Sequence, residues 1–164
     1  MHTASQTISK LLPFAVEASW ATGRWATLEK YTKMVPQDGA VDFNIGIGRS
    51  LLALQSKNAD QFKLSIHSAR EQIARSLSSA TTSSLSACHE NMLRLHVLTE
   101  LEMIAGTDDG LVPEHVSILE SLNRRLEVVG SYLNDKQYLL GIRRAAMQLS
   151  RFVALGNELI IGVC

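Results

Sequence analysis

Residues 15–31 of the chain read AVEASWATGRWATLEKY, and this stretch carries the signals of a complete turn between two helices. Before the turn, small side chains such as Ala15 and Ser19 allow a partner helix to approach closely. Gly23 then supplies the left-handed backbone conformation with which many helices end. The stretch therefore predicts that a first helix ends just before Gly23.

Large side chains surround this turn. Trp20 precedes the turn. After it, Leu28 and Tyr31 follow Trp25 at steps of three and six, so Trp25, Leu28 and Tyr31 lie on one face of a second helix. Aromatic residues are also favoured anchors for a bound peptide. Their spacing already gives them a packing role, so we predict a helical hairpin with these side chains in its core.

The remaining sequence has the same helical character. Apolar residues recur with a period near 3.6, and no alternating run is long enough to indicate a strand. We predict an all-α fold of stacked antiparallel helical hairpins, a TPR-like or HEAT-like α-solenoid of about seven to eight helices. The expected helices cover 13–22, with Pro13 in the first turn, and 25–35, 43–57, 62–77, 85–105, 114–133, 138–149 and 153–163.

Two positions suggest an internal repeat. Trp25 and Phe62 each follow a helix corner and lie 37 residues apart, close to the period of roughly 34 to 47 residues found in helical repeats. The turn between the sixth and seventh helices is expected at Asn134 and Asp135.

Length and ends indicate one segment of a longer protein. A chain of 164 residues fits a single domain, and we expect one α-solenoid segment over residues 1–164. Residues 157–164 form a helical pattern without a polar cap, so both ends are expected to be truncated. The two cysteines, Cys88 and Cys164, are too few for a disulfide framework and indicate a reducing compartment.

The charge balance argues against nucleic-acid binding. Lys plus Arg and Asp plus Glu both number 16, so no net positive field attracts a phosphate backbone. The pair Arg143–Arg144 is better explained as part of a helix face than as a groove reader. No apolar run approaches the roughly 20 residues needed to cross a bilayer, and no membrane contact is expected.

One group of residues has the spacing of a metal site. His89, His96 and Glu100 lie at steps of seven and four, on one side of the expected helix. No HExxH or CxxC motif accompanies them, so an ordinary helix face is the favoured interpretation, and no metal or other cofactor is expected. Cys88 precedes His89 directly, but adjacent helical residues point about 100 degrees apart, which does not suit a nucleophile and its base.

The residues Trp20, Gly23, Trp25 and Tyr31 resemble the helical FAT region of the phosphatidylinositol-3-kinase-related protein kinases. Two later stretches, residues 94–102 (RLHVLTELE) and 141–149 (GIRRAAMQL), are similar in order and separation to the ATR-type DNA-damage checkpoint kinases of that family. The turn at residues 31–36 is similar to that of the TOR-type kinases, which makes TOR the second choice.

The resemblance implies a partial FAT domain that cradles the kinase domain of a nuclear Ser/Thr kinase. By resemblance, it contacts other helical repeats of the parent chain and a regulatory protein, and it takes part in homodimer contacts. The chain lacks the VAIK, HRD and DFG motifs of protein kinases, so no catalytic residue is expected. The expected structural signature is Trp20, Gly23, Trp25, Tyr31, Phe62, His96, Glu100, Arg143 and Arg144.

Two alternatives remain open. A free-standing TPR-like adaptor would bind an extended peptide or helix on its concave face. A small helical metalloenzyme would use His89, His96 and Glu100.

Overall fold

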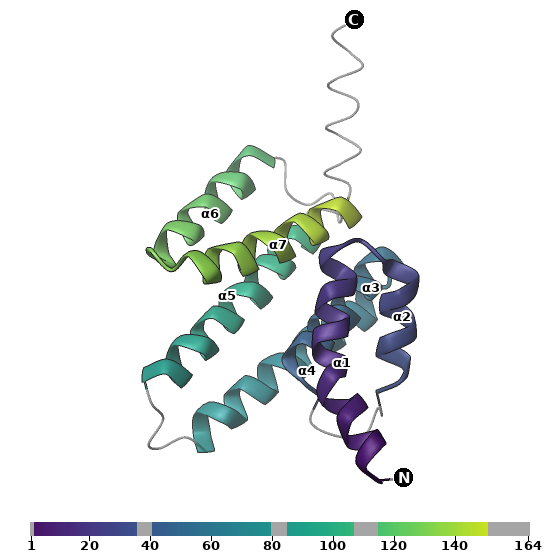
Figure 1. The fold of residues 1–164 in the computed structure, drawn as a ribbon. Helices are drawn as coiled ribbons and strands as arrows, with labels where there is room; N and C mark the ends of the chain where they lie inside the picture. The colour runs from purple at the N-terminus through teal and green to yellow at the C-terminus, as the bar shows by residue number, and fades with distance from the viewer. Residues whose placement is uncertain (1, 36–40, 80–84, 107–114, 151–164) are drawn as a thin grey trace, which may run out of the picture. The chain divides into compact units, whose positions relative to one another are not determined.

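The structure is a computed structural model that describes residues 2–35, 41–79, 85–106 and 115–150. All regular secondary structure in these ranges is helical and forms seven helices (Figure 1). The predicted all-α class is therefore confirmed, whereas the helix expected at 153–163 lies outside the described residues. The chain divides into two compact units, Met1–Ser79 and Ala80–Cys164. The expectation of one continuous segment over 1–164 stays a prediction.

The first unit consists of two helical hairpins. Helices α1 and α2 pack against each other, and both also contact α3, which in turn packs along α4 (Figure 1). Packing of each helix against the next in sequence is the arrangement of stacked helical repeats. The four helices are α1 (His2–Ala21), α2 (Trp25–Lys33), α3 (Phe43–Gln55) and α4 (Ala59–Ser79).

The corners of the two hairpins have the same hydrogen bonds. At the first, Gly23 has a φ of 70°, the Gly23 amide donates to the Trp20 carbonyl and the Arg24 amide donates to the Ser19 carbonyl. At the second, Lys57 has a φ of 54°, and its amide and that of Asn58 donate to the carbonyls at the matching positions, Leu54 and Ala53. Both corners are Schellman motifs.

The matching corners correct the predicted repeat. Gly23 and Lys57 are 34 residues apart, the length of a tetratricopeptide repeat. In this register Phe62 corresponds to Leu28, and both side chains are buried. Pairing Trp25 with Phe62 at 37 residues is therefore wrong, because large side chains occupy different turns of the two second helices.

A glycine lets α3 approach two helices at once. A Cβ atom on Gly48 would lie 2.7 Å from Val16 Cγ1 on α1 and 3.1 Å from Leu28 Cδ1 on α2. Both partner side chains are fully buried. The absence of a side chain at Gly48 is thus what allows the two hairpins to pack tightly.

The first helix is longer than predicted. It begins at His2, so Pro13 lies inside α1 rather than in its first turn. Proline lacks an N–H and disfavours a helical residue before it. Leu12 is nevertheless buried, and its packing favours a continuous helix across the proline.

The described residues of the second unit form three helices. Helix α5 contacts both of the others, and its core face presents Val97, Leu98, Leu101 and Ile104, whereas Met92 is exposed. The apolar residues of this helix are spread around its circumference, so spacing alone does not identify the buried face. The three helices are α5 (Leu85–Gly106), α6 (His115–Val128) and α7 (Leu133–Leu149).

The corner between α6 and α7 lies earlier than predicted. Gly130 has a φ of 74°, and its amide donates to the Glu127 carbonyl. Asn134 and Asp135 do not form the turn but belong to the first turn of α7, where a carboxylate interacts favourably with the helix dipole. Within the described residues, no helix is both long and apolar enough to cross a bilayer.

Candidate functional site

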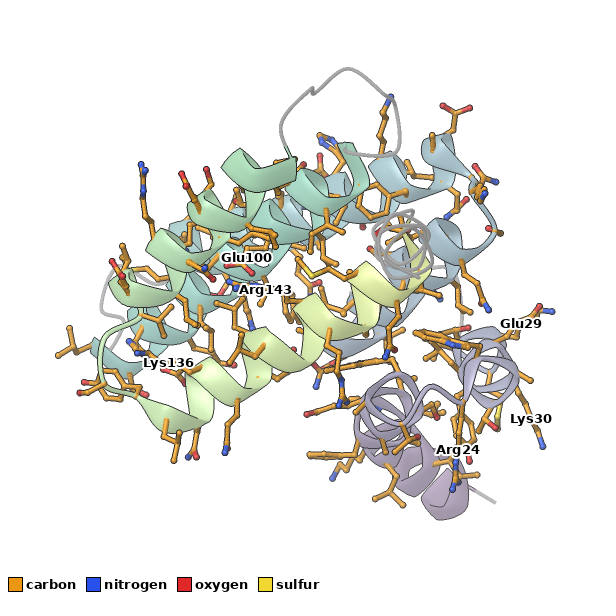
Figure 2. All side chains as sticks on the ribbon, turned by 90° about the horizontal axis from the view of Figure 1, so that it is seen from above. Arg24, Glu29, Lys30, Glu100, Lys136 and Arg143 are labelled. Carbon is orange, nitrogen blue, oxygen red and sulfur yellow. The ribbon has the colours of Figure 1, made fainter. Side chains whose placement is uncertain are left out.

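A buried ion pair connects the three helices of the second unit. Arg143 on α7 donates from Nε to Glu100 Oε2 at 3.0 Å and from Nη2 to Glu100 Oε1 at 2.9 Å. Arg143 Nη2 also donates to the Leu122 carbonyl of α6 at 2.9 Å. Figure 2 shows the two charged side chains pointing toward one another. We call Glu100, Arg143 and the Leu122 carbonyl the three-helix clasp.

The clasp lies almost entirely out of water. Only 8% of the Arg143 side chain and 2% of the Glu100 side chain are exposed. Burial of two charges is costly, so such a pair persists only with good geometry and further hydrogen bonds. The two-pronged contact and the bond to Leu122 supply both, and they fix the register of α5, α6 and α7.

A histidine lies beside the clasp. His96 is one turn before Glu100 on α5, and Arg125 Nη2 of α6 lies 3.4 Å from His96 Nδ1. Burial lowers the pKa of His96, the Arg125 guanidinium lowers the pKa further, and Glu100 opposes these effects. The neutral imidazole is thus the favoured form, because only an unprotonated Nδ1 accepts a hydrogen bond from arginine.

Arg144 has a different environment from its neighbour. Its side chain is exposed, while Arg143 is buried. Two consecutive helical residues point about 100 degrees apart, so one arginine enters the core and the other faces outward. Of the two consecutive arginines, Arg143 therefore contributes to the core and Arg144 to the surface.

The signature residues of the first unit surround the α1–α2 corner. Trp20 is 3% exposed, whereas Trp25 and Tyr31 are half-buried. Gly23 forms the corner, and Phe62 is buried in the following hairpin. The structure thus places these residues in the first unit and His96, Glu100, Arg143 and Arg144 in the second.

In the first unit, the Glu17 carboxyl has a raised pKa. Glu17 on α1 accepts a hydrogen bond from Asn44 Nδ2 on α3 at 3.0 Å. Burial raises the pKa of the Glu17 carboxyl, and the nearby Asp42 carboxylate raises it further. Burial of the charged form and repulsion from Asp42 both favour protonation of this carboxyl.

The three residues with metal-site spacing do not converge. Both carboxylate oxygens of Glu100 are bonded to Arg143, and His96 faces Arg125. His89 Nε2 instead lies 2.6 Å from Asp135 Oδ2 on α7. Among the residues described, no group of three or more His, Cys, Asp or Glu side chains is arranged to hold a metal ion.

The His89–Asp135 contact was not foreseen from the sequence. The His89 ring also lies 4.9 Å from the ring of Tyr132, at an angle of 55°. Cys88 is half-buried and carries a free thiol. The sequence predicts a turn at Asp135, so it does not indicate the contact with His89. The bond from Arg143 to Leu122 has no signal in the sequence either, because Leu122 contributes its backbone carbonyl.

A comparison with known families agrees with the all-helical fold. The FAT domain family model matches residues 12–157, which cover most of each compact unit and include every signature residue.

Proposed function

The chain belongs to the FAT domain family, and on that premise we propose that it is a scaffold and regulatory segment of a large Ser/Thr kinase of the ATR type. The FAT domain is a non-catalytic helical domain of the phosphatidylinositol-3-kinase-related kinases. In our proposal the segment cradles the kinase domain in the nucleus. It also contacts a regulatory protein and takes part in homodimer contacts during DNA-damage checkpoint signalling.

One observation supports a common role for the two stretches on which the ATR-type proposal rests. Glu100 belongs to the stretch 94–102 and Arg143 to the stretch 141–149, the two stretches that are similar to ATR-type kinases. These two residues meet in the buried clasp. A pair that fixes helix register gives both stretches a common reason to keep their residue types, which supports the proposal.

The clasp also suits a regulatory segment mechanically. Stacked helices that contact only their neighbours make an extended surface that bends at modest cost. A buried, fully hydrogen-bonded pair resists sliding of one helix past another, because separation of the charges would leave each of them unpaired. The second unit is thus suited to transmit a displacement rather than absorb it.

The adjoining coding sequence and the full-length protein test the proposal. We expect the reading frame to continue into a kinase domain with the VAIK, HRD and DFG motifs. The full-length protein, purified from cells, should phosphorylate protein substrates more strongly after replication stress. Activity that does not increase after DNA damage would count against the ATR type.

A free-standing adaptor is the second candidate, and the 34-residue spacing of the corners favours it, since this is the repeat length of peptide-binding tetratricopeptide proteins. The same experiment separates the two. A reading frame that ends without a kinase domain would leave the adaptor as the better explanation.

A further inference from the structure

The first unit contains a groove that the proposed scaffold role does not use. It has a volume of about 680 Å³, and its lining comes from α2, α3, α4 and Val41. Gly46 of α3 and Ala69 of α4 are part of this lining, and a Cβ atom on Gly46 would lie 4.0 Å from Ala69 Cβ. Small residues of α3 and α4 thus line this part of the groove.

Helix α4 lines the groove with neutral hydrogen-bonding groups. Gln61, Ser65, Ser68 and Gln72 follow each other at steps of four, three and four, so they form one stripe along the helix. Within the described part of the chain, none of these four side chains has a hydrogen-bond partner. By contrast, Ser19 and Ser50 bond to carbonyls of their own helices.

The length of the stripe suits a short extended peptide. Its steps of four, three and four residues advance about 6, 4.5 and 6 Å, whereas an extended chain presents groups to the same side about every 6.7 Å, so the two agree in total length and not step by step. The stripe from Gln61 to Gln72 is about 16 Å long, which corresponds to roughly five extended residues. Gln and Ser both donate and accept, so they can bind backbone amides and carbonyls of any sequence.

The charged side chains of the groove indicate the charge of the ligand that it binds. On α2, Lys33 Nζ and Glu29 Oε1 are 2.6 Å apart and neutralise each other (Glu29 is labelled in Figure 2). Arg49 on α3 donates only to the Val35 carbonyl, at 3.4 Å, and no carboxylate in the described chain faces it. Among the residues described, one guanidinium with spare donors therefore remains as the uncompensated charge of the groove.

We propose that the groove between α2 and α4 binds an extended acidic peptide segment, with its carboxylate on Arg49 and its backbone on the α4 stripe. A helical ligand fits less well, because its backbone groups are already bonded to each other and would leave the stripe unpaired. The proposal is independent of whether the parent protein is a kinase.

Peptide selection tests the assignment. The immobilised 164-residue chain is exposed to three pools of blocked peptides of about eight residues, random except for a central aspartate, asparagine or lysine. We expect enrichment from the aspartate pool alone. The selected peptides should shift the amide NMR signals of Arg49, Ser65 and Ser68 in the isotope-labelled chain.

Three variants complete the test. Arg49→Gln removes the charge and should weaken binding of the selected peptides at least about tenfold. Ser68→Leu fills the groove without a change of charge and should weaken binding similarly, with an unchanged melting curve. Arg75→Gln alters an exposed arginine of α4 that does not line the groove and should bind like the original chain.

Several results would overturn the proposal. These are no enrichment from any pool, equal enrichment from the asparagine pool, or signal changes confined to the second unit. Full binding by both Arg49→Gln and Ser68→Leu would also exclude this groove.

Discussion

Three described residues have a positive φ, and each lies at a helix corner: Gly23, Lys57 and Gly130. Glycine adopts this conformation at little cost, whereas a residue with a Cβ loses roughly 1–2 kcal/mol. Lys57 is thus the strained corner. Its hydrogen bonds match those of Gly23, so the structure needs the conformation even where the sequence lacks glycine.

Lys57→Gly is therefore expected to stabilise the chain by about 0.5–1 kcal/mol, because it removes strain without loss of a hydrogen bond. Urea denaturation followed by circular dichroism measures the change. Ser56→Gly is the matched control, since Ser56 has a φ of −80° and gains nothing from glycine. A Lys57→Gly variant as destabilised as Ser56→Gly would contradict the corner geometry.

His96 gives the second unit a dependence on pH. Its pKa in the folded chain lies below the ordinary 6.5, so the unfolded chain binds more protons below that pH. The contribution of neutral His96 to the stability is fully present above about pH 6.5 and is lost as the pH falls toward the folded-state pKa. The physical reasons for the lowered pKa are that burial disfavours the charged imidazolium and that this cation would face the Arg125 guanidinium.

His96→Gln should flatten this decline between about pH 7.5 and pH 5.5, as measured by urea midpoints. His67→Gln is the control, because His67 is a largely exposed residue of α4. Equal pH profiles for the original chain and His96→Gln would show that this histidine is not responsible.

At the scale of the elements, two glycines of α3 have opposite expected effects. Gly48→Ala would place a Cβ 2.7 Å from Val16 Cγ1, and overpacking of this kind costs about 1–3 kcal/mol. Gly46→Ala meets only Ala69 Cβ at 4.0 Å and should gain up to about 1 kcal/mol from helix propensity.

Thermal and urea unfolding of the two variants measure the packing of α3 on the first hairpin directly. Both substitutions improve helix propensity equally, so the difference between them reports the close approach alone. If Gly48→Ala were as stable as Gly46→Ala, the two hairpins would not pack as the structure shows.

The clasp predicts strong non-additivity between α5 and α7. Arg143→Leu leaves the Glu100 carboxylate buried and unpaired, which should cost about 3–5 kcal/mol. The double variant Glu100→Leu/Arg143→Leu removes both charges and should lose far less than the two single losses combined.

A double-mutant cycle by urea denaturation measures this coupling. Arg124→Leu is the control, because Arg124 is 78% exposed and should change stability by less than about 0.5 kcal/mol. Additive losses at Glu100 and Arg143 would mean that the pair is not formed in solution.

Helix positions were predictable where a local signal exists. Gly23 and Pro36 delimit the first hairpin in the sequence, and α2 to α5 lie within a few residues of their expected bounds. The start of α1 was missed because packing of Leu12 overrides a local rule about Pro13. The repeat register was missed because Lys57 occupies a position where sequence reasoning looks for glycine.

The contacts of the clasp depend on long-range geometry. Glu100 and Arg143 are 43 positions apart, and neither helical period nor charge indicates that they meet. The resemblance to the FAT region includes both residues in the expected signature, but their bidentate contact is visible only in the structure. The Leu122 carbonyl leaves no trace in sequence, because any residue supplies a backbone oxygen.

For the whole molecule, we propose that the chain acts through its packing and not through reactive side chains. Cys88 and His89 are the side chains best suited to chemistry, and neither of them takes part in the clasp. The pair that stabilises the second unit has both of its charges engaged with each other. Loss of packing should therefore impair the parent protein, whereas loss of these side chains should not.

The most direct test compares the regulated protein-kinase activity of the full-length parent protein in three variants. Arg143→Leu should abolish the increase in substrate phosphorylation after replication stress, although it alters no catalytic group. Cys88→Ala and His89→Gln should retain that increase. Loss of activity in Cys88→Ala or His89→Gln, with full activity in Arg143→Leu, would contradict the account.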